Sequence, residues 1–145
     1  TFEVNRIKYT VTGENSVGVS GLNENYEPGE VKLTEVIIPS TVENAGKNYT
    51  VTSVEEYAFR WTSDIRKIEL PNTVTELKNN AIYYNYDLEE IGLSENITKL
   101  GAYSSKLFCQ RRRIDKHYFR QRFYIYRQRR FLQSRHGRNN DSGKL

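Results

Sequence analysis

Few side chains in this sequence are of the types that catalyse reactions or hold metal ions. Its 145 residues include one Cys, Cys109, and two His, His117 and His136. One thiol excludes a disulfide scaffold and a zinc site built from several thiolates. Two imidazoles leave little for acid–base catalysis, and no base accompanies Cys109 as a nucleophile. We therefore expect no catalytic residue, no cofactor and no metal site, in a chain that is not an enzyme.

Four aromatic residues are the candidates for a partner-binding site. Trp61 and Tyr84 are 23 residues apart, and Tyr83 and Tyr86 lie close to Tyr84 in the sequence. Aromatic side chains gathered on one edge of a protein can hold a sugar or an apolar side chain of a partner. The alternative interpretation, and the commoner role of such rings, is that they cover the hydrophobic core at turns.

The charged residues divide the chain into two parts. Residues 1–105 contain 9 Lys and Arg against 16 Asp and Glu, whereas residues 106–145 contain 13 against 2. Arg-rich runs in the basic part alternate with Phe and Tyr, as in an arm that binds phosphates and stacks on bases. Residues 1–105 are predominantly acidic and give no reason for the chain to carry such an arm, so we do not expect nucleic acid to be the partner.

Two further features concern the cellular context. No apolar run approaches the roughly 20 residues that a membrane-spanning helix needs, so we expect no membrane insertion. The chain begins at Thr1 and contains no Met, so we expect a piece of a longer protein.

The aromatic candidates belong to an internal repeat of 23 residues. Eight apolar positions recur at this spacing without a gap between Val54 and Leu100. The pairs are Val54–Leu77, Ala58–Ala81, Phe59–Ile82, Ile65–Leu88, Ile68–Ile91, Leu70–Leu93, Val74–Ile97 and Leu77–Leu100. Since about 23 residues cannot bury their own apolar face, successive units must stack and share one core. The less specific alternative is an ordinary mixed sheet.

Each unit predicts a short strand. Ile68 and Leu70 alternate with polar residues, which is typical of a strand with one buried face, and Pro71 then ends it. Val74 and Leu77 bring the chain back across the core as a turn or a second short strand. Stacking predicts full burial of the leucines Leu70, Leu77, Leu88 and Leu93. It also places Arg66 beside Glu89 and Lys67 beside Glu90 on neighbouring strands.

The N-terminal residues predict a cap for the first unit. Apolar residues alternate with polar ones at 2–4 and 7–11, on either side of Asn5-Arg6, which suits a two-residue hairpin turn. A solenoid needs such a cap because its first open edge would otherwise pair with other strands.

The repeat resembles the BspA-type leucine-rich repeat of bacterial surface proteins. Residues 68–77, Ile-Glu-Leu-Pro-Asn-Thr-Val-Thr-Glu-Leu, look like the family's unit, and Asn80-Ala81-Ile82 follows them. Residues 2–11 resemble the family's opening hairpin, and residues 46–54 resemble the insertion after its first unit. The resemblance covers residues 1–103. The family's frequent Cys is replaced by Thr62 and Asn85.

The resemblance implies a mainly β fold, a leucine-rich-repeat solenoid of short parallel strands with a 23-residue period. We expect an N-terminal β cap at residues 1–30, repeats at 31–105 and an irregular, loosely packed basic tail at 106–145. It also implies a non-catalytic binding or adhesion module, extracellular or on the cell surface, whose partner is a protein or glycan of another cell or the host matrix. The alternative is a recognition or spacer segment of a larger secreted enzyme.

The basic tail departs from the repeat and leaves three hypotheses open. Positions 23 residues after Leu88, Leu93 and Ile97 are all basic. The first hypothesis is the phosphate-binding arm described above. The second is translation one nucleotide out of frame. Permitted codons for residues 111–131, read one base later, can give DVELTSITFGNGFTSIGNEDF, and its ITFGNGFTSIG portion aligns with residues 91–101. The third is a tail without function. Because an Arg-rich segment is a poor cap for the apolar face of the last coil, we expect self-association through that end.

Overall fold

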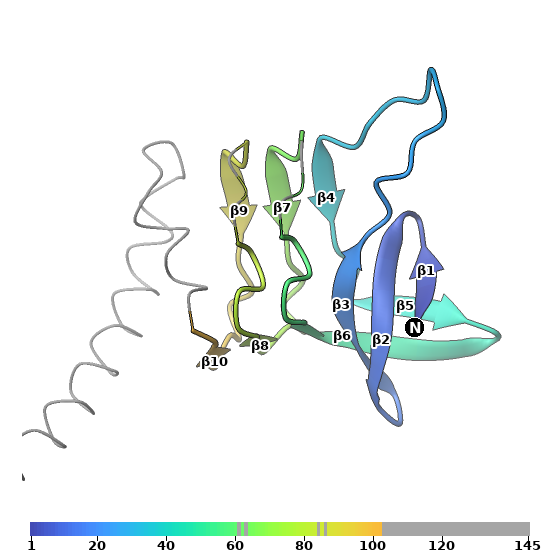
Figure 1. The fold of residues 1–145 in the computed structure, drawn as a ribbon. Helices are drawn as coiled ribbons and strands as arrows, with labels where there is room; N and C mark the ends of the chain where they lie inside the picture. The colour runs from blue at the N-terminus through green and yellow to red at the C-terminus, as the bar shows by residue number, and fades with distance from the viewer. Residues whose placement is uncertain (61, 63, 84, 86, 103–145) are drawn as a thin grey trace, which may run out of the picture. The chain divides into compact units, whose positions relative to one another are not determined.

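The described part of the chain consists of short β-strands. The computed structural model describes residues 1–60, 62, 64–83, 85 and 87–102, which contain no helix (Figure 1). Consequently no helix able to cross a membrane occurs within these residues. The strands are β1 (Phe2–Val4), β2 (Ile7–Gly13), β3 (Ser16–Leu22), β4 (Glu35–Ile37), β5 (Thr41–Asn44), β6 (Lys47–Val54), β7 (Lys67–Glu69), β8 (Glu76–Leu77), β9 (Glu90–Gly92) and β10 (Lys99–Leu100).

These strands form two sheets that share one core. The larger sheet has the order β1-β2-β3-β6-β8-β10, with β5 paired to β6, and the smaller has the order β4-β7-β9. Each repeat unit contributes one strand to each sheet, and both ladders of repeat strands are parallel. Ile68 pairs with Ile91 and Leu77 with Leu100, which is the 23-residue register that the sequence predicts. The predicted solenoid is confirmed, and β8 and β10 show that each unit returns as a second short strand.

The N-terminal strands form the predicted hairpin. Asn5 and Arg6 have φ of 50° and 67°, the left-handed conformation that a tight hairpin turn requires. β2 continues antiparallel to β3, and β3 then pairs in parallel with β6. A side chain at Gly18 would collide with the Glu55 carboxylate and the Ser53 hydroxyl, which explains a glycine at this close approach.

The core consists of inward rows of aliphatic side chains. Val36, Ile68 and Ile91 of the smaller sheet are 2%, 0% and 5% exposed, and Val54 and Leu77 of the larger sheet are fully buried. Such rows stabilise by removing apolar surface from water.

The prediction of full burial is correct for Leu70, Leu77 and Leu88 but wrong for Leu93, which is half-buried. Leu70 is covered by the coil that follows it. The residues 23 positions after the unit of Leu93 lie outside the described residues.

Two polar residues replace the family's Cys inside the core. Thr62 and Asn85 are 5% and 2% exposed. The Thr62 hydroxyl donates to the Asn85 side-chain carbonyl, and the Asn85 amide donates to the Phe59 backbone carbonyl. Because these buried polar groups bind one another, the departure from the family pattern is accommodated without an unpaired group at these positions.

Candidate binding surface

The structure describes only one of the four predicted aromatic site residues. Trp61, Tyr84 and Tyr86 lie outside the described residues. Tyr83 is half-buried in the loop between β8 and β9, directly after the buried Ile82. The aromatic site therefore stays a prediction.

An aromatic side chain that the sequence analysis did not single out lies on the equivalent loop of the preceding coil. Tyr57 is 44% exposed, and the Arg60 guanidinium lies 4.9 Å from the centre of its ring. Tyr57 has φ of 58°, and Asn80, 23 residues later, has φ of 54°, so the two loops turn in the same way. In the sequence, Tyr57 lies 23 residues before Asn80 and directly before the apolar repeat position Ala58, which is the only signal there for its place on the loop.

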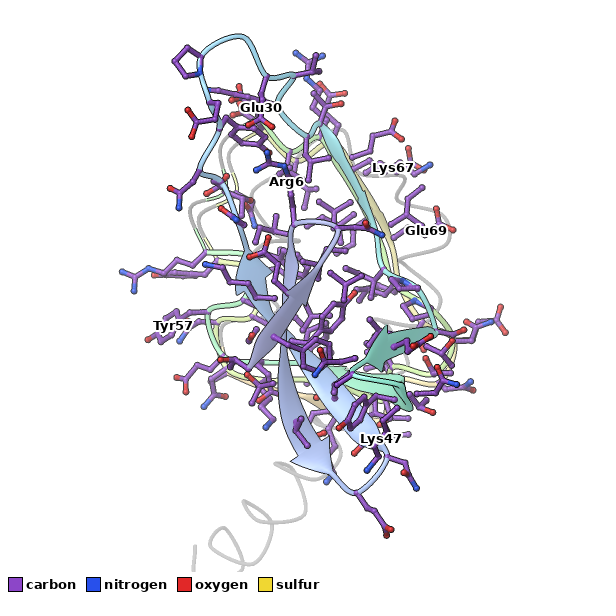
Figure 2. The ribbon with its side chains drawn as sticks, turned by 90° about the vertical axis from the view of Figure 1, so that its right-hand side faces the viewer. Arg6, Glu30, Lys47, Tyr57, Lys67 and Glu69 are labelled. Carbon is purple, nitrogen blue, oxygen red and sulfur yellow. The ribbon has the colours of Figure 1, made fainter. Side chains whose placement is uncertain are left out.

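The outer face of β4, β7 and β9 is a second exposed surface, hereafter the ladder face. Alternate residues of each strand point away from the core, because side chains in a strand alternate between faces. The strand register aligns these outward positions in two rows, Glu35–Lys67–Glu90 and Ile37–Glu69–Gly92. Figure 2 shows Lys67 and Glu69 on the side of the described part opposite to Tyr57. The ladder face and the Tyr57 loop are therefore separate surfaces.

Charges on the ladder face are linked by weak ion pairs. The Lys67 ammonium lies 3.8 Å from a carboxylate oxygen of Glu90 and 3.9 Å from one of Glu69. The predicted neighbours Lys67 and Glu90 are confirmed. Arg66 and Glu89 are also neighbours, since the Glu89 N–H donates to the Arg66 carbonyl at 2.7 Å, but the ion pairs among the described residues do not join their side chains. Exposed pairs of this kind contribute about 0–1 kcal/mol each.

Two titratable side chains elsewhere in the described part, Lys78 and Tyr9, have shifted pKa values because of structural contacts or burial. The Lys78 ammonium donates to Glu55 at 2.8 Å, and this hydrogen bond raises the pKa of Lys78. Burial raises the pKa of Tyr9 to about 12.

The described residues contain no group of three His, Cys, Asp or Glu side chains that could hold a metal ion.

A cluster of hydrogen bonds around Arg6 fixes the loop between β3 and β4. The Arg6 guanidinium donates to the Glu30 carboxylate at 2.8 Å and to the Asn25 carbonyl at 3.0 Å, and it lies 4.4 Å from the centre of the Tyr26 ring. The Glu27 N–H also donates to Glu30, and these hydrogen bonds lower the pKa of the Glu30 carboxyl. Arg6 and Glu30 thus hold the loop to the hairpin (Figure 2).

A sequence comparison identifies the repeat. Residues 29–136 match the BspA type leucine rich repeat region in six copies. The match extends past residue 103, where the resemblance was expected to end, and into the basic part of the chain. Among curated proteins, none matches the sequence significantly.

Solved structures of bacterial leucine-rich repeat proteins share the fold. A leucine-rich repeat protein from Bacteroides ovatus is 31% identical, with a TM-score of 0.59 over 66% of this chain and 24% of that one. One from Bacteroides capillosus is 24% identical, with a TM-score of 0.61 over 70% of each chain. A leucine rich cell surface protein from Faecalibacterium prausnitzii is 19% identical, with a TM-score of 0.56 over 69% of this chain and 26% of that one. The chain therefore spans about a quarter of the Bacteroides ovatus and Faecalibacterium proteins.

Proposed function

The chain belongs to the BspA-type leucine-rich repeat family, and from this we propose that it is a non-catalytic binding module of a bacterial surface or secreted protein. We place its partner site on the ladder face. Proteins built from leucine-rich repeats generally mediate protein interactions, so a protein is the expected partner. The Faecalibacterium protein of similar fold is a cell surface protein, which supports a surface location.

The proposal rests on a difference between the two faces of each ladder strand, one buried in the core and one exposed. The inward row Val36–Ile68–Ile91 is at most 5% exposed and serves the core. The outward rows form one continuous surface of different chemical types, with carboxylates, an ammonium group and the apolar Ile37 at strand spacing. We therefore expect substitutions at outward positions to change recognition while leaving the buried row intact.

The charge of this surface favours a basic partner segment. Glu35, Glu69 and Glu90 outnumber Lys67 on the ladder face, and residues 1–105 as a whole carry 16 acidic against 9 basic residues. Complementary charge accelerates encounter and selects among partners more than it strengthens a complex. We therefore expect a partner surface with Lys or Arg, and binding that weakens as salt is added.

The test uses immobilised host extracellular matrix proteins, with a glycan array as a parallel arm. The charge-reversal variant Glu69→Lys with Glu90→Lys should lose binding to a matrix protein that the wild type binds. A matched control, Glu14→Lys with Glu43→Lys, makes the same charge change at exposed positions outside the ladder face and should bind as the wild type does.

Three outcomes would overturn the proposal. The first is absence of binding to every matrix protein, and the second is equal loss in the control variant. The third is loss only in a variant with Tyr57→Ala and Tyr83→Ala, which would move the site to the loops on the other side.

A further inference from the structure

We propose that β4 binds an extended segment of a protein partner as a fourth strand of the β4-β7-β9 ladder. The segment places Lys or Arg beside Glu35 and an apolar side chain beside Ile37. This inference rests on the proposed binding function and adds the geometry and the chemistry of the bound segment.

The backbone of β4 has an open edge. The Thr34 carbonyl accepts the Arg66 N–H at 2.7 Å, and the Ile38 N–H donates to the Glu69 carbonyl at 2.9 Å. In a parallel ladder alternate residues direct their N–H and C=O groups to the same neighbour, so those of Glu35 and Ile37 point to the other side. β4 ends its sheet, and no strand of the described residues pairs with that side (Figure 1).

The outward charges leave Glu35 at the end of an alternating row. The row runs Glu35, Lys67, Glu90, from negative to positive to negative. Ion pairs join Lys67 to Glu90 and to Glu69, whereas none of the ion pairs among the described residues includes Glu35. A cation on a fourth strand would continue the alternation, since opposite charges directly across strands are favourable.

The second outward row leaves an apolar side chain uncovered at the same edge. Ile37 is 59% exposed, and Val31, just before the strand, is 92% exposed. Glu69, the neighbour of Ile37, lies over Gly92, with its Cγ 3.2 Å from where a Cβ on Gly92 would be. An apolar side chain beside Ile37 would remove this surface from water.

The edge of β4 lacks several of the usual devices against strand addition, and its charge favours one kind of occupant. Natural edge strands are protected by short length, charged side chains, Pro, a bulge or a covering segment. The three residues of β4 are Glu, Val and Ile, and its pairing with β7 has no bulge. A second copy that paired through its own β4 would bring another Glu35 close to this one, whereas a basic partner segment is attracted to it. The observations therefore favour a basic segment over self-association.

A peptide titration of the ¹⁵N-labelled full chain tests the proposal. The probe is acetyl-Ile-Thr-Lys-Thr-Ile-amide, which places Lys beside Glu35 and Ile beside Ile37 in either strand direction. Its control has Glu in place of Lys. We expect the largest amide shifts at Glu35 and Ile37 and a preference for the Lys peptide of up to about fivefold, as for a cross-strand charge pair. Glu35→Lys should reverse the preference.

Ile37→Pro separates edge pairing from contact with the outward face. The Ile37 N–H points to the open side, so Pro is compatible with the fold there but removes a donor that a fourth strand needs. This variant should lose peptide binding, whereas Ile37→Thr, which keeps the N–H, should retain most of it. Slower amide exchange at Glu35 and Ile37 in the wild type with peptide bound checks the pairing without any variant.

Equal binding by Ile37→Pro, or no preference between peptides, would overturn the proposal. Concentration-dependent shifts at the same amides without peptide would identify a second copy as the occupant and also overturn it. The ladder-face proposal is judged separately, because its variant changes Glu69 and Glu90 and leaves β4 intact.

Discussion

Truncation of Leu77 is the sharpest test of the shared core. Leu77 is fully buried and pairs with Val54 on one side and Leu100 on the other, so its side chain is enclosed by coils before and after it. Leu77→Ala removes three carbon atoms and leaves a cavity that two regular ladders cannot easily collapse. We expect the free energy of unfolding to fall by about 2–5 kcal/mol, as for other buried Leu→Ala changes.

The repeat provides a matched control 23 residues later. Leu100 occupies the equivalent position but is only half-buried, so Leu100→Ala should cost less, about 1–2 kcal/mol from the smaller apolar area involved. Urea unfolding of both variants, followed by circular dichroism, measures the difference. A loss below about 0.5 kcal/mol for Leu77→Ala, far under the range for buried leucines, would show that the assigned register is wrong.

Three further predictions follow from individual contacts. A double-mutant cycle on Lys67 and Glu90 should give a coupling of about 0.2–1 kcal/mol that disappears in 1 M salt; coupling unchanged by salt would contradict an exposed ion pair. Asn85→Ala should destabilise by about 1–3 kcal/mol because it leaves buried polar groups unpaired, and a neutral result in urea unfolding would refute that hydrogen-bond network. The pKa of the Glu30 carboxyl is lowered by hydrogen bonds from Glu27 N–H and Arg6, so its stabilising contribution is present above the ordinary carboxyl pKa and is lost as the pH falls through the lowered one. The difference in melting temperature between wild type and Glu30→Gln should therefore shrink in acid, and a constant difference would argue against the ion pair.

The buried half of the fold could be predicted because a repeat constrains it strongly. Most inward positions must be apolar in every coil, so the 23-residue spacing of pairs such as Ile68 and Ile91 is sufficient to assign both ladders. The hairpin turn at Asn5-Arg6 was equally predictable from two alternating segments of fixed length. Full burial of Leu93 was predicted wrongly because the spacing shows on which side of its strand Leu93 lies, whereas the extent of burial depends on everything that packs against it.

The exposed surface could not be predicted in the same way, because the 23-residue spacing does not determine how surface side chains and strand edges are arranged. The sequence placed Lys67 beside Glu90, but the direction in which a flexible side chain leans is set by all its neighbours, and Lys67 also approaches Glu69. The open edge of β4 requires knowing which strand is the last of its sheet. The buried pair Thr62 and Asn85 stood out in the sequence only as a departure from the family, and its hydrogen bonds needed the three-dimensional arrangement.

The most direct test of the ladder face as the binding site compares two dissociation constants for one matrix protein at physiological salt. We expect Glu69→Lys with Glu90→Lys to weaken binding at least about tenfold, equivalent to about 1.4 kcal/mol. Glu14→Lys with Glu43→Lys should leave the dissociation constant unchanged. Equal constants for the two variants would contradict the central claim.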